Sequence, residues 1–236
     1  MIDIEKSPFI VGVLNPKYFD KELDYLIEHQ PDIVEYRADL ADDLDVFLFK
    51  EDLIEINKKL NLPILFTLRD KSEGGKFAGS NAQRNEIYSA AMEFAAAIDI
   101  ESSLAGENDE IIKTAHAKGI AVVLSYHNFE KTPEKSELEE IIKDCFSNGA
   151  DIAKIAAICE TKNEAEQLIS LTVKHKNIAV VGMGKYGKVT RITAPAFGSV
   201  LTYAFTDNKE SPVPGQLTVK ELKEAWELAG IKNNDE

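Results

Sequence analysis

Short apolar runs alternate with helix-length amphipathic segments along the whole chain, and this alternation constrains the fold more than any other feature. Eight such runs are rich in the branched and aromatic residues typical of strands: 8–14, 32–37, 63–69, 97–101, 120–127, 151–156, 177–183 and 199–205. A helix-like segment follows each run. Eight units of roughly 30 residues predict an α/β fold, a single (β/α)8 barrel over residues 1–236. A doubly wound open sheet is the alternative.

Polar side chains gather where five consecutive predicted strands end. In a barrel, alternate residues of each strand face inward, and the active site forms at the carboxyl ends of the strands. A single charge at a strand end is usually a solvated rim residue, whereas a run of five indicates one shared site. The residues concerned are Glu35, Arg37, Thr67, Arg69, Asp99, Glu101, Ser125, His127 and Lys154.

Lys154 stands inside the otherwise apolar segment 149–157. A strand of this kind is covered on both faces, so an ammonium is costly to bury there and the neutral amine is favoured. A neutral lysine amine is a nucleophile that forms imines with carbonyl compounds. The alternative is a strand-end lysine whose amine reaches water. This segment alone does not separate the two, but the polar residues at the neighbouring strand ends favour a nucleophile.

His127 is the only histidine at a predicted strand end. Its ordinary pKa lies near neutral pH, so beside an imine-forming lysine it would shuttle protons. The alternative is a buried core histidine. A catalytic histidine needs an orienting partner, and Glu73, Asp99 and Glu101 are all candidates. No set of acidic residues and histidines has metal-site spacing, so we predict no metal.

The protein has only four arginines, and three of them are placed near the predicted mouth. Arg37 and Arg69 lie at strand ends, and Arg191 follows the Gly-rich turn at 182–188; Arg84 lies in a helix-like segment and is predicted to be structural. The planar guanidinium matches carboxylates and hydroxyls in fixed geometry. We therefore expect a small anionic, hydroxylated ligand at this mouth. The alternative is that the arginines form ion pairs that only stabilise the top of the barrel.

Two loops near the end of the chain have more than one interpretation. The turn at 182–188 is either a phosphate cradle or a tight turn that directs Arg191 to the mouth. The loop at 211–216 contains two prolines and a glycine, which suits a lid, although a plain connector is the default.

The overall charge and the cysteines limit the class of protein. There are 27 basic and 41 acidic residues, a net charge of −14, and such a surface repels nucleic acid and anionic membrane. No apolar stretch is long enough to span a bilayer, and we expect no signal peptide. Cys145 and Cys159 lack metal-ligand spacing and are expected to be free thiols of a reducing compartment, so we predict a cytoplasmic protein.

Taken together and in order, these motifs resemble the type I 3-dehydroquinate dehydratase family over about residues 8–230. Each motif is weak alone, but their order and spacing make the set specific. They are Glu35-Tyr36-Arg37, Thr67-Leu68-Arg69, Glu73-Gly74-Gly75, Asp99-Ile100-Glu101, Ser125-Tyr126-His127-Asn128-Phe129, Ala153-Lys154-Ile155-Ala156, Met183-Gly184, Gly187 with Arg191, Phe197-Gly198-Ser199 and Pro214-Gly215-Gln216.

The resemblance implies a (β/α)8 barrel, commonly a homodimer, that needs no metal or organic cofactor. The implied reaction is syn elimination of water from 3-dehydroquinate to give 3-dehydroshikimate. In it Lys154 would form an imine with the C3 ketone, and His127, oriented by Glu73, would be the general acid and base. The residues that would bind the substrate are Arg191 at its carboxylate, Glu35, Arg37 and Arg69 at ring hydroxyls, and Ser211 and Gln216 from the last loop.

Two features differ from some members of that family, and two other functions compete with it. The first strand offers no hydroxyl at 9–13, and Pro212 stands where some members have a serine. One competing function is another imine-forming barrel enzyme, an aldolase or transaldolase acting on a sugar phosphate. The other is a non-catalytic barrel that binds a metabolite or partner. The joint presence of Lys154, His127, Glu73 and Arg191 argues against the latter, because a pure binder needs no buried nucleophile.

Overall fold

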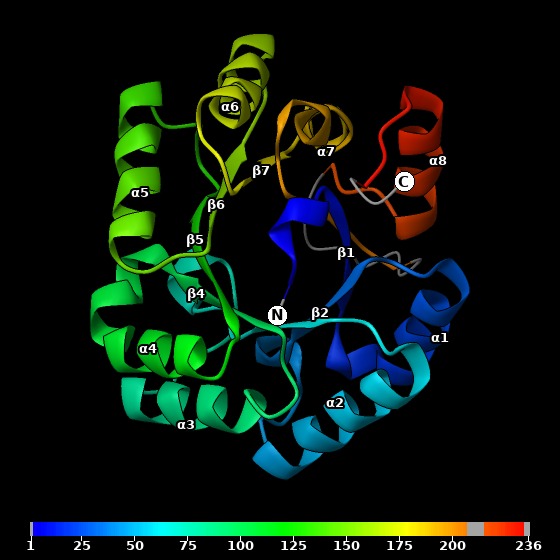
Figure 1. Ribbon diagram of the computed structural model, residues 1–236, viewed down its shortest axis with the longest axis vertical. Helices are drawn as coiled ribbons and strands as arrows, with labels where there is room; N and C mark the ends of the chain where they lie inside the picture. The colour runs from blue at the N-terminus through cyan, green and yellow to red at the C-terminus, as the bar shows by residue number, and fades with distance from the viewer. Residues whose placement is uncertain (1, 207–214, 234–236) are drawn as a thin grey trace.

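The structure is a computed structural model that describes residues 2–206 and 215–233, and it is the predicted (β/α)8 barrel (Figure 1). Eight parallel strands pair in the order β7-β6-β5-β4-β3-β2-β1-β8. Their bounds are β1 (Phe9–Leu14), β2 (Ile33–Arg37), β3 (Ile64–Thr67), β4 (Ala97–Glu101), β5 (Ala121–Asn128), β6 (Ile152–Ile158), β7 (Ile178–Met183) and β8 (Leu201–Ala204).

The helices surround these strands, as Figure 1 shows. Four of them begin at a side-chain cap, because Asp45 accepts from two backbone N–H groups and Ser80, Thr161 and Thr218 form capping boxes. None of the helices in the described ranges is long and apolar enough to cross a membrane. The helices are α1 (Phe19–His29), α2 (Val46–Leu60), α3 (Asn81–Ala91), α4 (Asp109–Ala117), α5 (Lys135–Ser147), α6 (Lys162–Lys174), α7 (Gly187–Thr193) and α8 (Val219–Ala229).

The barrel closes between β7 and β8 through a single bridge instead of a continuous ladder. Ile178 and Ser199 form this bridge, and the backbone N–H of Val200 donates to the carbonyl of Ile178 at 2.8 Å. The Ser199 hydroxyl accepts from the backbone N–H of Val180 at 3.0 Å. A side chain therefore replaces part of the missing backbone pairing at this seam.

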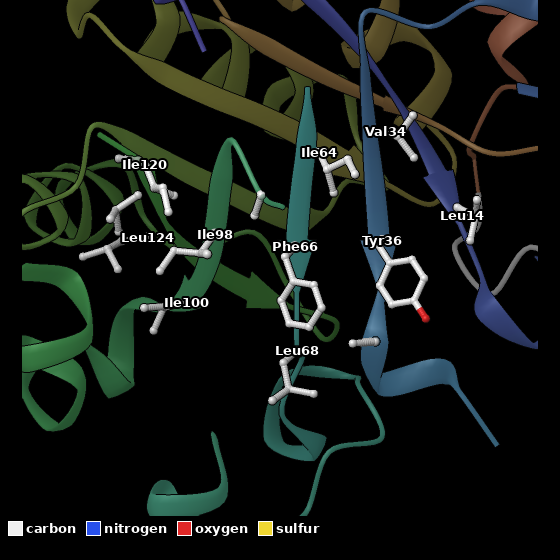
Figure 2. Packing of buried hydrophobic residues seen from close by; sticks show 14 of the residues in the cluster. Leu14, Val34, Tyr36, Ile64, Phe66, Leu68, Ile98, Ile100, Ile120 and Leu124 are labelled. Carbon is white, nitrogen blue, oxygen red and sulfur yellow. The ribbon is translucent and has the colours of Figure 1, made fainter. Parts of the chain in front are cut away.

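Apolar side chains form two layers, one on each face of the cylinder of strands. The outer layer packs against the helices, and Figure 2 shows part of it around Tyr36, Phe66 and Ile98. The inner layer fills the barrel and includes Val11 and Leu201. Two layers arise because successive residues of a strand point to opposite faces.

The register of the strands brings the polar residues together above the inner layer. Lys154 of β6 is the partner of Ser125 of β5, and Ser125 is the partner of Glu101 of β4. Inward-facing polar groups on adjacent strands therefore lie side by side at the carboxyl ends, where the sequence predicts the site.

Candidate active site

A cavity of about 240 Å³ opens at the carboxyl ends of the strands. Pockets for drug-sized ligands usually measure about 300–1,000 Å³, so this one suits a smaller molecule. Its lining includes eight of the nine residues predicted from the sequence: Glu35, Arg37, Arg69, Glu73, His127, Lys154, Arg191 and Gln216. The ninth, Ser211, lies outside the described residues, as does Pro212.

Lys154 is buried in the cavity wall, with 5% of its surface exposed. Its Nζ donates to Asp99 Oδ2 at 3.0 Å and lies 4.0 Å from the centre of the Tyr203 ring. The amine therefore does not snorkel to water, as the alternative interpretation required; a buried carboxylate and an aromatic face replace the solvent. Both contacts fix the position of the nitrogen atom.

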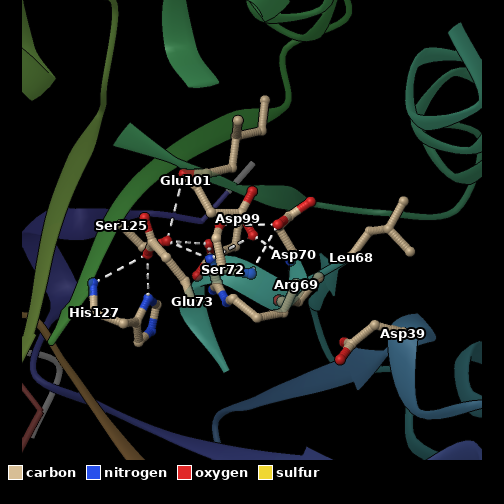
Figure 3. Close-up of polar contacts among 12 residues, drawn as sticks. Asp39, Leu68, Arg69, Asp70, Ser72, Glu73, Asp99, Glu101, Ser125 and His127 are labelled. Carbon is tan, nitrogen blue, oxygen red and sulfur yellow. Dashed lines mark hydrogen bonds and ion pairs between the residues drawn. The ribbon is translucent and has the colours of Figure 1, made fainter. Parts of the chain in front are cut away.

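His127 is paired with Glu73, not with either of the rival carboxylates (Figure 3). Glu73 Oε2 lies 2.9 Å from His127 Nδ1 and also accepts the backbone N–H of His127 at 3.0 Å. Burial raises the pKa of Glu73 to about 7. Burial, reinforced by the positive charges of Arg69 and Lys154, holds the pKa of His127 well below its usual value. An ionised Glu73 keeps the proton on Nδ1 and leaves Nε2 as a base.

Asp99 and Glu101 instead belong to a buried ionic network, which Figure 3 shows around Arg69. Arg69 donates to Asp99 at 2.6 Å, to Ser125 at 2.7 Å and to Glu101 at 3.2 Å. Burial alone would raise the pKa of Asp99, but Arg69 and Lys154 outweigh it and hold that pKa below its usual value. Arg84, from α3, adds a second guanidinium at Glu101, 3.1 Å away, which agrees with its predicted structural role.

Two further predicted residues lie on β2 at the same cavity. Arg37 makes a two-point contact with Asp39, both distances being 2.9 Å, and is largely buried. Glu35 accepts from the Thr67 hydroxyl at 2.8 Å. Both side chains are therefore held in place by neighbours before any ligand binds, which favours precise contacts.

Arg191 is a cation without a carboxylate partner among the residues that the structure describes. It is 1% exposed, and its donors face the backbone carbonyls of Gly182, Gly187, Tyr203 and Gly215 at 2.6–3.2 Å. Burial lowers its pKa to about 10, so it still carries a charge at neutral pH. A buried and uncompensated guanidinium on a cavity wall attracts an anionic ligand.

The Gly-rich turn holds Arg191, as one of its two interpretations proposed. Gly187 is tightly enclosed: a Cβ there would lie 3.0 Å from Arg191 Nη1 and 3.0 Å from the carbonyl of Gly182. Two carbonyls of the turn face the guanidinium. A carbonyl repels a phosphate, so this arrangement does not favour a phosphate cradle at these atoms.

Comparison with known proteins shows the family to which the chain belongs. The family model of type I 3-dehydroquinase matches residues 11–233, nearly the whole chain. The chain belongs to the type I 3-dehydroquinase family. A 3-dehydroquinate dehydratase from Methanosarcina acetivorans is 36% identical over 234 residues, which cover 96% of each chain.

Solved structures of this family have the same fold. A type I 3-dehydroquinate dehydratase from Clostridium difficile, with covalent modified comenic acid, gives a TM-score of 0.86 at 28% identity and covers 94% of this chain and 92% of its own. The 3-dehydroquinate dehydratase from Aquifex aeolicus gives 0.83 at 28% identity, covering 92% of this chain and 96% of its own.

Two contacts at the site of this type I 3-dehydroquinase are not evident from the sequence. Asp99 is one of the polar strand-end residues that the sequence places at the site, but its contact with Lys154 appears only in the structure. Tyr203 lies in a predicted strand and was not singled out, although a hydroxyl inside an apolar strand is a signal in itself, since it needs a partner. Among the described residues, no group of three or more His, Cys, Asp or Glu side chains is placed to hold a metal ion.

Proposed function

We propose that this chain is a type I 3-dehydroquinate dehydratase of the shikimate pathway, a hydro-lyase that acts through an imine on Lys154. Membership of the family supports the overall reaction. The observation that carries the mechanism is that a buried lysine and a histidine–carboxylate pair line one small cavity. This combination supplies a nucleophile for a ketone and a base for the proton beside it.

The first step is formation of the imine. Once it has given up a proton, the Lys154 amine attacks the C3 ketone, an N–C bond forms, and the ketone oxygen leaves as water. His127 can take the proton that Lys154 must lose, because its imidazole is neutral at neutral pH and its pairing with Glu73 through Nδ1 leaves Nε2 free. Asp99 and Tyr203 hold the nitrogen in place during this exchange.

Elimination follows from the imine. His127 removes the C2 proton, and the protonated imine accepts the electron pair that remains on C2. Without the imine, the carbanion at C2 would be too unstable to form. The electron pair then returns to expel the C1 hydroxyl group, which leaves as water with the proton from His127. Hydrolysis of the imine consumes one water and frees the amine, so the net change is the loss of one water molecule.

Binding is assigned to the remaining polar residues of the cavity. Arg191 takes the substrate carboxylate, because it is the buried cation that faces only neutral carbonyls in the described ranges. Glu35, Arg37 and Arg69 contact the ring hydroxyls. Gln216, a lining residue, and Ser211 contact the substrate from the last loop.

The covalent mechanism is tested by trapping the imine with borohydride. Wild-type protein treated with borohydride and 3-dehydroquinate should gain the mass of one reduced ligand, and peptide mapping should place it on Lys154. Lys154→Ala should gain none, whereas Lys76→Ala should still be labelled, because Lys76 is an exposed lysine at the same cavity. The structure of the C. difficile relative contains covalent modified comenic acid, which supports a covalent step in this proposal.

Kinetics separate the roles of the two central residues. Lys154→Ala should lose turnover and still bind 3-dehydroquinate, while His127→Ala should be about 10²–10⁴-fold slower and accumulate the trapped imine. An active Lys154→Ala enzyme would refute the imine mechanism. Turnover of a sugar phosphate instead of 3-dehydroquinate would favour an aldolase, and binding without any turnover would favour a non-catalytic barrel.

We also propose that the enzyme is a cytoplasmic homodimer that needs no cofactor. The dimeric state is inferred from the family resemblance. The cytoplasmic location is inferred from the two cysteines, which are both free and buried. Sedimentation equilibrium of the purified protein checks the dimer: a single species of one-chain mass at micromolar concentration would contradict it.

A further inference from the structure

Tyr203 lies on the inner face of β8, the strand that pairs with β1. Tyr203 is in register with Val11, and both belong to the inner apolar layer. The preceding residue, Thr202, points the other way, and its hydroxyl donates to the backbone carbonyl of Arg191. The alternation of the strand therefore directs the Tyr203 side chain into the barrel.

The ring of Tyr203 is fixed beside the nucleophile. Lys154 Nζ lies 4.0 Å from the ring centre, and Tyr203 itself is 4% exposed and lines the cavity. A cation over an aromatic face is attracted to it, so the ring supports both the ammonium and a protonated imine. The ring is therefore held in the same part of the cavity as the Lys154 nitrogen.

The hydroxyl of Tyr203 is buried and has no hydrogen-bond partner among the described residues. The chain satisfies its other two fully buried tyrosines: Tyr36 donates to Asp52 at 2.6 Å and Tyr88 to the backbone carbonyl of Asp99 at 2.6 Å. Leaving a buried hydroxyl unpaired costs stability, so an exception beside a nucleophile points to a partner that arrives with the ligand.

The surrounding groups make this hydroxyl a donor. Burial and the negative charges of Glu35 and Asp99 raise the pKa of Tyr203 well above its usual value, so the phenol keeps its proton. Neither carboxylate takes that proton as a hydrogen bond, since Glu35 accepts from Thr67 and Asp99 from Arg69, Ser125 and Lys154. The neighbouring first strand brings only the apolar Val13 to the cavity.

We propose that the Tyr203 hydroxyl donates a hydrogen bond to a substrate oxygen next to the carbon bonded to Lys154, and so helps to select a hydroxylated ring. This inference rests on the proposed function, because it assigns one more contact to the same substrate. Tyr203 thus acts twice: its ring supports the lysine nitrogen, and its hydroxyl recognises the substrate. A site that hydrogen-bonds a substrate hydroxyl discriminates strongly against analogues that lack it.

Tyr203→Phe tests the hydroxyl while keeping the ring. We expect kcat/KM for 3-dehydroquinate to fall about tenfold, equivalent to about 1.4 kcal/mol. The Kd for 3-dehydroquinate, measured by calorimetry, should rise by a similar factor when the change is added to the non-reacting Lys154→Ala variant. The melting temperature of the ligand-free enzyme should stay the same or rise, because the variant removes an unpaired buried polar group.

Tyr36→Phe is the matched control. It also removes one hydroxyl from a buried tyrosine, but on the outer face, where the hydroxyl is bonded to Asp52. It should lower the melting temperature and leave kcat/KM unchanged. Tyr203→Phe is thus expected to lower activity without loss of stability, and Tyr36→Phe to lower stability without loss of activity.

Other outcomes overturn the inference in distinguishable ways. The wild-type enzyme could be active while Tyr203→Phe changes neither kcat/KM nor the Kd measured in the Lys154→Ala variant. That result would show that the hydroxyl contacts no substrate. A Tyr203→Phe protein that loses activity and melting temperature together would show a structural role. A folded wild-type protein without turnover would refute the proposed function, and this inference with it.

Discussion

Glu73 makes the activity depend on pH through one carboxyl group. Burial raises its pKa to about 7, so it is ionised above that pH and can hold the Nδ1 proton of His127. Below that pH the protonated carboxyl no longer accepts this proton, and Nε2 is no longer kept free as a base. We expect kcat/KM to rise between pH 6 and 8, as measured by a pH–rate profile.

Glu73→Gln should remove that pH dependence because glutamine does not titrate. The rate at pH 8 should fall by about tenfold to a hundredfold, less than the full contribution of general acid–base catalysis, since an amide oxygen still accepts from Nδ1. Glu130→Gln, at an exposed position, is the control. If Glu73→Gln keeps the wild-type rise in kcat/KM near pH 7, then another group causes that rise.

The same carboxyl group should affect stability with a defined sign. Its pKa in the folded protein, about 7, lies above its ordinary value of 4.5, so between these pH values the folded state binds more protons than the unfolded state. Its stabilising contribution is complete below about pH 4.5 and is lost as the pH rises through 7. In urea titrations at pH 5 and pH 8, wild type should lose more stability with rising pH than Glu73→Gln does.

At the level of single residues, sequence reasoning found the reactive groups but not all of their partners. Lys154 and His127 are conspicuous because each is unusual for its position in a strand. Glu73, Asp99 and Glu101 are equivalent carboxylates in the sequence, and only three-dimensional packing separates them. Arg69 draws Asp99 and Glu101 into one network, which leaves Glu73, on a loop, to reach the histidine.

Among the elements, the loop between β3 and α3 decides where Glu73 lies. The loop folds back on the end of β3, where Gly75 N–H donates to the carbonyl of Asp70 at 2.9 Å. A Cβ on Gly75 would lie 2.0 Å from the carbonyl oxygen of Arg69, and backbone cannot move aside as a flexible side chain can. Gly75→Ala should therefore displace the loop and separate Glu73 from His127.

The expected loss for Gly75→Ala is about a hundredfold in kcat/KM, the size of effect that a misplacement of about 1 Å produces. Gly106→Ala is the matched control, because a Cβ there meets nothing within 4 Å. It should leave kcat/KM unchanged and change the free energy of unfolding by urea by less than about 0.5 kcal/mol. Equal kinetics for the two variants would mean that the loop does not control the site.

The elements themselves were largely predictable, and the loops were not. Strand β4 occurs at 97–101 as predicted, because apolar alternation and a following polar stretch define both of its ends. Strand β3 is shorter than predicted, Ile64–Thr67 instead of 63–69, because Arg69 turns its backbone toward the loop and accepts from Phe77. Loop conformations depend on such long-range contacts, which no periodic pattern encodes.

For the whole molecule, the closed ring of strands is what brings the site together. Lys154 lies on β6 and Tyr203 on β8, which are the two strands on either side of β7. The contact between their side chains inside the barrel therefore depends on β7 and on the seam between β7 and β8. The seam has one bridge, and Ser199 substitutes for backbone pairing there. Its hydroxyl accepts from the Val180 N–H and donates to the Leu201 carbonyl, both at 3.0 Å.

Ser199→Ala should therefore destabilise the barrel as a whole, because it leaves a buried N–H and a buried carbonyl without a side-chain partner. The expected loss is about 1–3 kcal/mol in the free energy of unfolding by urea, with an unchanged slope. Ser147→Ala, which removes an exposed hydroxyl bonded to a carbonyl within α5, should cost less than about 0.5 kcal/mol. Equal stabilities for the two variants would mean that the bridge and its backbone bond close the ring without the serine, whereas a selective loss for Ser199→Ala would make this hydroxyl part of the barrel's closure.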